Sequence, residues 1–348
     1  MDIQTLLDTK LREGLGSGCF PGAVAACGRK DEVYALSFTG KIALGSEYVN
    51  RLTRYDMASL TKVLAPTMLA FKAIEDGRLT LYDTLGQWFE GVPEDKKDIT
   101  VFMLMTHTAG FVPSFRLDEA GIEPGEALKA ILSSKLVSKP GEAPNYSCMG
   151  YITLGKLLEK LYGESLDVLS QKYVFKPLGM AHTGYLPEGG NIAATEVDPQ
   201  TGRAWQGIVH DENARFLGGV SANAGVFSSI DDMLIFCAML SKGGDGFVSR
   251  ALMQKAIRNY TPGFDVHRGL GFHLAGTEYN YMGDLFPECS FGHTGFTGTS
   301  VAIDPTTGFY VILLSNRVHP TRESEGLFRF RRSLHNALYA EFDKHILQ

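Results

Sequence analysis

Apolar and polar positions alternate in different ways along the chain, and four short runs have the composition of β-strands. Residues 23–28 and 32–39 are rich in small apolar and β-forming residues and are separated by a polar turn at residues 29–31. Residues 300–303 and 309–314 form a similar pair around a turn at residues 304–308. The pattern therefore predicts strands near both ends of the chain.

Apolar residues at helical spacing mark four longer segments. They predict a helix over residues 1–16, a second over residues 59–75 that begins at or just before Ser59, and a third over residues 229–240. A closing helix is predicted over about residues 323–346, with an apolar face formed by Leu327, Leu334, Leu338 and Phe342.

The middle of the chain, residues 79–215, has sparse strand patterning and consists of helical segments broken by loops that contain proline and glycine. We therefore expect an α+β protein in which residues 1–78 and 216–348 together form one sheet domain and residues 79–215 form an inserted, mostly helical domain. A cleft between two such lobes is a common place for a small-molecule site.

Composition and charge exclude several classes of function. The formal net charge is -6 and basic residues are scattered, so no nucleic-acid partner is expected. No segment approaches the roughly 18 uninterrupted apolar residues of a membrane span, and the first residues lack the pattern of a signal peptide, which favours a cytoplasmic location. The five cysteines lie far apart without metal-binding spacing, so neither disulfides nor a metal site is expected.

The segment Ser59-Leu60-Thr61-Lys62 carries the first candidate chemistry. On a helix, residues three apart lie on the same face, so the hydroxyl of Ser59 and the amine of Lys62 can touch. A serine hydroxyl becomes a useful nucleophile when a neighbour removes its proton. In the first helical turn, the Ser59 N–H would also be free to bind a developing oxyanion. The alternative is that Ser59 only caps the helix and Lys62 is solvated, but the apolar helix behind them favours burial.

Two further segments have suitable chemistry. Tyr146 precedes a predicted helix, on a turn rather than on an apolar stripe, and a neighbouring Lys62 would favour its phenolate form as a base. The alternative is a packing tyrosine. In residues 292–300, closely spaced glycines let a ligand approach the backbone, and an edge strand there could offer the Phe296 N–H as a second oxyanion donor.

Several other histidine-containing segments have simpler interpretations. His107 and His182 each lie in a predicted loop, and His210-Asp211-Glu212 fits a helix cap better than a metal site, because adjacent residues rarely converge on one ion. The sequence lacks a Gly-x-Ser-x-Gly elbow, a phosphate loop and a His-Glu-x-x-His motif. No cofactor is expected.

Taken in order, Ser59-x-x-Lys62, Tyr146-x-Cys148 and His293-Thr294-Gly295 resemble the three motifs of the serine β-lactamase and penicillin-binding-protein superfamily, in particular its class C β-lactamase, DD-peptidase and esterase branch. The resemblance covers nearly the whole chain. It implies an antiparallel sheet flanked by helices with an inserted helical domain. It also implies that Ser59 is acylated, that Lys62 and Tyr146 handle the proton, and that Ser59 and Phe296 N–H groups form the oxyanion hole.

Two departures from the family pattern shape the expected substrate. Cys148 stands where the family usually has Asn, and His293 stands where efficient β-lactamases usually have Lys. His293 and Thr294 are expected to contact the substrate. We therefore expect a serine hydrolase of small esters or D-amino-acid amides, with a β-lactamase or DD-carboxypeptidase proper as the alternative. Two further hypotheses are a non-catalytic, penicillin-binding sensor or scaffold and an enzyme that uses Cys148 as its nucleophile.

Overall fold

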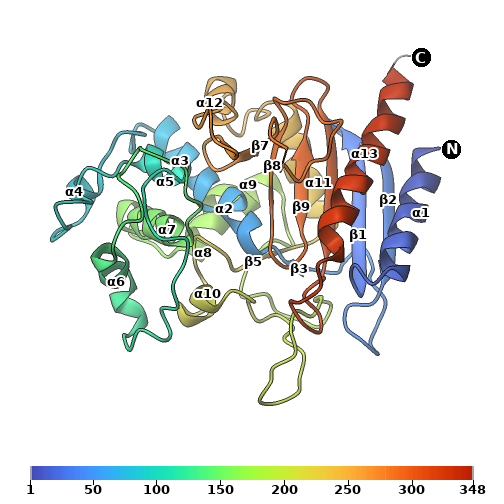
Figure 1. The fold of residues 1–348 in the computed structure, drawn as a ribbon, viewed down its shortest axis with the longest axis horizontal. Coiled ribbons are helices and arrows are strands. Elements are labelled where there is room, and N and C mark those ends of the chain that lie inside the picture. Colours follow the sequence, from blue (N-terminus) through green and yellow to red (C-terminus); the bar gives the residue numbers. More distant parts are fainter. Residues whose placement is uncertain (1, 279, 347–348) are drawn as a thin grey trace.

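The computed structural model describes residues 2–278 and 280–346, and its elements follow the strand-rich ends and helical middle expected from the sequence. Strands and long helices from both ends of the chain lie together on one side of Figure 1, and the shorter helices of the middle lie on the other. Within the described residues, no helix combines the length and the apolar composition needed to cross a bilayer.

A seven-stranded antiparallel sheet has the order β2-β1-β10-β9-β8-β7-β6. The first and last segments of the chain meet within this sheet, where β1 pairs with β10 and Ala23 lies opposite Ser315. β1 also pairs with β2, and β9 pairs with β10, so the two predicted strand pairs are confirmed. The bounds are β1 Gly22–Arg29, β2 Glu32–Gly40, β6 His267–Arg268, β7 His273–Leu274, β8 Phe291–Thr294, β9 Ser300–Ile303 and β10 Phe309–Ser315.

Helices cover both faces of this sheet. Because side chains of a strand alternate between faces, Ala25 and Leu313 pack with α1 (Ile3–Gly16) and α13 (Gly326–Ile346), whereas Val24 belongs to the core on the opposite face. The opposite face carries α11 (Ile230–Ser241). The predicted apolar face of the last helix is confirmed, since its four residues are buried in the first of these cores: Leu327, Leu334, Leu338 and Phe342.

The middle of the chain contributes short helices and one strand of a small second sheet, whose order is β3-β5-β4. The bounds are β3 Tyr55–Asp56, α4 Leu85–Trp88, α5 Val101–Met105, η2 Pro124–Glu126, α6 Ala127–Ser133, α7 Cys148–Tyr162, α8 Leu166–Ser170, η3 Gln171–Phe175, α9 Lys176–Leu178, β4 Gly184–Tyr185, α10 Glu212–Phe216, β5 Val226–Ser228 and α12 Arg250–Ala256. One continuous apolar core contains side chains of the middle and of the large sheet, such as Leu154 and Val24. The division into two domains stays a prediction.

The helix predicted over residues 59–75 is broken, which corrects the sequence analysis. The chain forms η1 (Ala58–Leu60), α2 (Thr61–Leu64) and α3 (Pro66–Glu75), with Ala65 at φ -116° and ψ -79° between the last two. Pro66 has no N–H for the helical ladder and its ring crowds the preceding turn, so a helix tends to stop or bend before it. Ser59 and Lys62 consequently lie on a short helical segment rather than on a long helix.

The packing of α13 predicts a large cost for shortening one of its buried side chains. Leu334 is fully buried between α13 and the sheet. Leu334→Ala should lower the free energy of unfolding by about 2–5 kcal/mol, because it removes apolar contacts and leaves a cavity. Denaturant unfolding measures this value. The control is Ser333→Ala, at an exposed position of the same helix, and an equal effect of the two substitutions would contradict the described packing.

Candidate active site

Ser59 lies just after the short strand β3, on a segment that the Asp56 carboxylate holds in place. One oxygen of that carboxylate accepts a hydrogen bond from the Ala58 N–H at 2.8 Å and the other from the His210 N–H at 2.7 Å. Ala58 has φ +45°, in the left-handed region that residues with a side chain rarely adopt. Burial raises the pKa of Asp56, and these N–H donors oppose that rise. The carboxylate therefore stabilises the unusual backbone that presents Ser59.

Lys62 is fully buried, and its ammonium lies beside the Ser59 hydroxyl. Lys62 Nζ donates to Ser59 Oγ at 3.1 Å and to the Asn223 carbonyl oxygen at 2.9 Å, and it lies 3.6 Å from Cys148 Sγ. Because Ser59 and Lys62 are three residues apart on consecutive helical turns, their side chains face the same way, as the sequence spacing predicts.

The charge of Lys62 is set by two opposing effects. Burial alone would lower the pKa of its ammonium. Attraction to the negative forms of Cys148 and Tyr146, together with a hydrogen bond to Tyr146, outweighs burial, so the pKa of Lys62 lies above its ordinary value. Lys62 therefore supplies a fixed positive charge at neutral pH.

Tyr146 comes from a different part of the chain and meets this pair. It lies in the extended segment directly before α7, whose N-cap is Ser147, with Ser147 Oγ accepting from the Gly150 N–H at 3.2 Å. The centre of the Tyr146 ring lies 4.9 Å from Lys62 Nζ. The structure thus brings together the hydroxyl, the ammonium and the phenol that the sequence motifs single out.

His107 packs behind this site against Tyr146, which the sequence did not indicate. As expected it lies in the loop after α5, but its ring centre is 4.5 Å from that of Tyr146, and its Nδ1 accepts the Ser147 N–H at 3.1 Å. Burial and the nearby charges of Arg268 and Lys62 hold the pKa of His107 well below its usual value. A neutral His107 therefore fixes the position of the segment that carries Tyr146.

The end of β8 forms the opposite side of the site. His293 is buried, its Nδ1 lies 2.8 Å from the Thr294 carbonyl oxygen, and burial lowers its pKa well below the usual value. At Gly295 a Cβ atom would lie only 2.4 Å from the Met57 carbonyl oxygen, so only glycine allows the strand end to approach the segment before Ser59 this closely. Thr294 and Gly295 line the same pocket as Ser59.

The expected position of Phe296 on an edge strand was wrong. β8 lies between β7 and β9, and Phe296 lies in the turn that follows β8, where the chain leaves the sheet to reach β9. Two bonds hold this turn: Arg317 Nε donates to the Phe296 carbonyl oxygen at 2.9 Å, and Thr297 Oγ1 donates to the Asp56 carbonyl oxygen at 2.6 Å. In the described part of the chain, neither the Ser59 N–H nor the Phe296 N–H has a hydrogen-bond acceptor.

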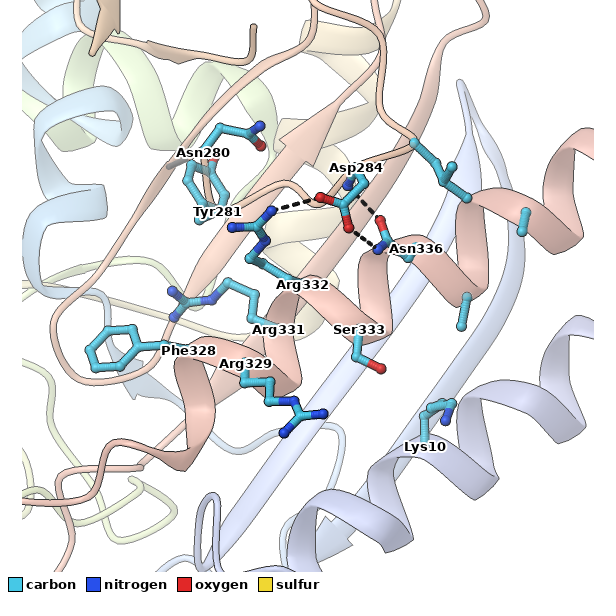
Figure 2. A pocket seen from close by; sticks show the side chains of 13 residues that line it. Lys10, Asn280, Tyr281, Asp284, Phe328, Arg329, Arg331, Arg332, Ser333 and Asn336 are labelled. Atoms are coloured by element: carbon cyan, nitrogen blue, oxygen red, sulfur yellow. Dashed lines mark hydrogen bonds and ion pairs between the residues drawn. The ribbon is translucent and has the colours of Figure 1, made fainter. Parts of the chain in front are cut away.

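A pocket of about 320 Å³ opens over Ser59. Its lining residues are Ser59, Tyr146, Arg268, His273, His293, Thr294, Gly295, Phe296, Arg317, Phe328 and Arg331. Cys148 is not among them, although its sulfur lies near Lys62. A larger hollow of about 980 Å³ lies along α13 and shares Phe328 and Arg331 with this pocket, but it contains no nucleophile beside a base (Figure 2).

The sequence motifs do not include the three arginines of the pocket. Arg268 lies on β6, Arg317 follows β10, and Arg331 lies on α13. One signal was present in the sequence: Arg331 occupies the apolar face of the last predicted helix, four residues after Leu327 and three before Leu334. A charged residue on such a face is expected to be buried, and charged residues are rarely buried without a partner.

The remaining histidine segments serve the fold. His210 Nε2 lies 2.8 Å from Glu196, Asp211 caps α10 by accepting from the Ala214 N–H, and Glu212 pairs with Arg322, so the three neighbours diverge. The expected cap is confirmed. Near His182, Thr183 donates to the carboxylate of Asp232 at 2.6 Å. Across residues 2–278 and 280–346, no group of three or more His, Cys, Asp or Glu side chains is arranged to hold a metal ion.

The antiparallel sheet, its covering helices and the helical segments beside it define a fold of the β-lactamase and transpeptidase type. Comparison with known proteins gives the family. The chain belongs to the beta-lactamase family, because the family model of that description matches residues 7–336. The family membership supports a hydrolase.

Two curated relatives extend this result. The chain is 30% identical to a protein of Escherichia coli K12 named "Putative D-alanyl-D-alanine carboxypeptidase", with 77% of this chain and 70% of the relative covered. It is 31% identical to a Bacillus subtilis protein named "N-acetylmuramyl-L-alanine amidase", with 90% of this chain and 80% of the relative covered.

Solved structures of low sequence identity confirm the fold. EstCE1, described as a hydrolase with promiscuous acyltransferase activity, superposes with a TM-score of 0.79 at 21% identity and covers 97% of this chain and 98% of its own. The octameric penicillin-binding protein homologue of Pyrococcus abyssi gives a TM-score of 0.74 at 23% identity, covering 94% of this chain and 76% of its own. These similarities show a shared fold.

The buried histidines predict a loss of stability in mild acid. Burial lowers the pKa of His335 to about 3, and it holds the pKa of His107 and of His293 well below the usual value. As the pH falls below about 6.5, the unfolded chain binds protons that the folded chain does not, so the free energy of unfolding falls. Between pH 7 and 5, each histidine contributes a slope of at most about 1.4 kcal/mol per pH unit.

Denaturant unfolding at pH 7, 6 and 5 measures this slope. His335→Leu should reduce the slope by about the contribution of one histidine, because the buried His335 imidazole, which has no hydrogen-bond partner among the described residues, is removed. The control His182→Gln, at an exposed position, should leave the slope unchanged. A free energy of unfolding that is constant from pH 7 to 5 would contradict the neutral, buried state of these rings.

Proposed function

We propose that this protein is a serine hydrolase in which Ser59 attacks an ester, amide or lactam carbonyl and becomes acylated. The observation that supports this proposal most directly is the 3.1 Å hydrogen bond from the buried Lys62 ammonium to Ser59 Oγ, beside Tyr146 and beneath the pocket. A hydroxyl activated by neighbouring groups and oriented by a third one is the usual arrangement for covalent catalysis.

Tyr146 is the proposed base, because Lys62 keeps its proton. The pKa of Lys62 lies above its ordinary value, so this side chain has no free lone pair at neutral pH. The proposed base is the phenolate of Tyr146, whose ring centre lies 4.9 Å from the Lys62 ammonium. In acylation, the phenolate takes the Ser59 proton as the oxygen attacks and gives that proton to the leaving group. In deacylation, Tyr146 takes a proton from the attacking water and returns it to Ser59 as the acyl group leaves.

The oxyanion formed during attack has two backbone donors in reach of the pocket. The N–H groups of Ser59 and Phe296 have no acceptor within the described structure, and both residues line the pocket. Donors that are fixed before the reaction stabilise developing negative charge without reorganisation, and loss of one typically slows such reactions about 10²- to 10³-fold.

The site favours small esters or D-amino-acid amides over the lactams of efficient β-lactamases. His293 is neutral, because burial lowers its pKa well below the usual value, so position 293 supplies no fixed positive charge. Cys148 lies outside the pocket, so position 148 does not supply the amide contact that the family usually has there. The relatives named as a carboxypeptidase and an amidase support acyl transfer at an amide carbonyl.

A second candidate is a penicillin-binding sensor that keeps the fold without turnover, and the position of Cys148 beside Lys62 favours it. Intact-protein mass after exposure to a β-lactam or a phosphonate separates the candidates. The hydrolase should carry one adduct at Ser59 that disappears with time for a hydrolysable acyl group. A stable adduct without turnover of any ester would support the sensor, and no adduct at all would support a scaffold.

Ser59→Ala tests the nucleophile. Turnover of a chromogenic ester should fall about 10³-fold or more, because the bond-forming oxygen is removed. The matched control is Cys148→Ala, which removes the other nucleophile next to Lys62 and should keep most of the activity. Circular dichroism and unfolding verify that both variants fold. Retained activity in folded Ser59→Ala would exclude this serine, and loss only in Cys148→Ala would identify the thiol as the nucleophile.

Tyr146→Phe tests the proposed base. This variant keeps the ring that packs on Lys62 and His107 but removes the phenol oxygen, so kcat should fall about 10²- to 10⁴-fold. Tyr151→Phe is the control, since the Tyr151 ring also lies near Lys62, at 5.6 Å, but is buried outside the pocket. Equal activities of the two variants would contradict the role of Tyr146.

A further inference from the structure

Three buried arginines face the pocket over Ser59. The exposed fractions of Arg268, Arg317 and Arg331 are 9%, 3% and 4%, and each side chain lines the pocket. A guanidinium group in so little water is expensive to bury unless an opposite charge or several acceptors compensate it. Three such groups around one small pocket therefore need a compensating partner.

The described residues do not provide one. Within residues 2–278 and 280–346, the guanidinium groups of Arg268 and Arg331 have neither a hydrogen bond nor an ion pair, and Arg331 Nε is buried without an acceptor. Arg317 donates only to carbonyl oxygens of Phe296, Arg322 and Ser324. Among the described residues that line the pocket there is no Asp or Glu. Arg331 keeps its charge at neutral pH because burial lowers its pKa only to about 10.

Two arginines outside the pocket form ion pairs with acids, unlike the arginines of the pocket. Arg332, the next residue on α13, pairs with Asp284 at 2.6 Å. In Figure 2, Arg332 turns toward Asp284 while Arg331 extends to the side of Phe328, away from that acid. Arg322 likewise pairs with Glu196 and Glu212. The chain therefore forms ion pairs with these two arginines, whereas the arginines of the pocket have no ion pair within the described residues. Glu196 and Glu325 act on Arg317 only from a distance.

The unpaired charges approach the pocket from two sides of β8. This part of the sheet has the order β10-β9-β8-β7-β6, and Arg268 lies on β6 whereas Arg317 lies two residues after the end of β10. Arg331 comes from α13, which covers the sheet beside β10. Arg268 packs over the ring of Tyr146, while Arg317 packs over Phe296 and Phe328. One anion cannot neutralise both positions as well as two separated anions can.

We infer that the preferred substrate of this site is a dicarboxylate, with one carboxylate bound by Arg268 and the other by Arg331 and Arg317 on the far side of β8. The inference rests on the proposed acyl transfer at Ser59 and specifies its substrate. Guanidinium forks match carboxylates in geometry, and a hydrogen bond to a charged group contributes more than a neutral one. The arginines thus act in specificity rather than in bond making.

A matched series of thioesters tests the inference by release of the thiol. The neutral member is the acetyl thioester of mercaptoethanol, and the acetyl thioester of mercaptoacetate has one carboxylate. The dianionic members are the succinyl thioester of mercaptoacetate, with one carboxylate on each side of the carbonyl, and the acetyl thioester of mercaptosuccinate, with both on one side. At least one dianionic member should exceed the monoanionic one in kcat/KM by about 10- to 100-fold.

Arg331→Met and Arg268→Met should each lower kcat/KM for the preferred dianionic thioester at least about tenfold more than kcat/KM for the neutral thioester. Arg331→Lys, which keeps the charge, should retain part of the preference and separates a charge effect from a packing effect. Arg329→Met is the matched control, because Arg329 is exposed on the same helix and does not line the pocket. Its preference should be unchanged.

Binding to the folded Ser59→Ala variant gives a readout that does not depend on turnover. Calorimetry should show N-succinylglycine binding at least about tenfold more tightly than N-acetylglycine. Equal binding of the two, or equal binding of inorganic phosphate, would overturn the two-centre dicarboxylate site. Failure to hydrolyse any thioester would instead contradict the proposed function, and the binding result would still decide the inference.

Discussion

The buried ammonium of Lys62 is the interaction on which the candidate site depends. A fully buried cation is stable only where acceptors surround it, and here these are Ser59 Oγ, the Asn223 carbonyl oxygen and the sulfur of Cys148. The three acceptors come from separate segments of the chain. The cation therefore ties η1, the start of α7 and the loop before β5 to one point, and it places the Ser59 hydroxyl there as well.

Burial leaves the histidines around Lys62 neutral, but it leaves the arginines charged. Histidine starts from a pKa near 6.5, so the desolvation of His107 and His293 leaves both rings neutral in the folded protein at pH 7. Arginine starts far higher, so Arg331 remains charged with a pKa of about 10. The same loss of water thus yields uncharged rings beside Tyr146 and fixed positive charges at the rim of the pocket. The polarity of the site is set by its arginines and by Lys62.

Much of the fold and part of the site could be predicted from the sequence, because they depend on local patterns. The richness in β-forming residues located the two strand pairs, helical spacing located the long helices, and the three-residue spacing placed Ser59 beside Lys62. The break at Ala65 was missed because the apolar spacing continues through Pro66, although proline interrupts the backbone ladder. Arg268 and His107 could not be assigned, because their roles depend on which distant strands and loops become neighbours of Tyr146.

The contact between Lys62 and Cys148 also bears on which nucleophile the site prepares. Sulfur is a weak acceptor, and the 3.6 Å separation is longer than the 3.1 Å from Lys62 to Ser59. The ammonium therefore orients the hydroxyl more strongly than the thiol. The pocket is lined by Ser59 and not by Cys148, so a substrate carbonyl that enters it meets the oxygen first. The N–H of Ser59, which lacks an acceptor, lies beside the proposed nucleophile, whereas no comparable donor accompanies the sulfur in the described residues. Both geometry and electrostatics favour the serine.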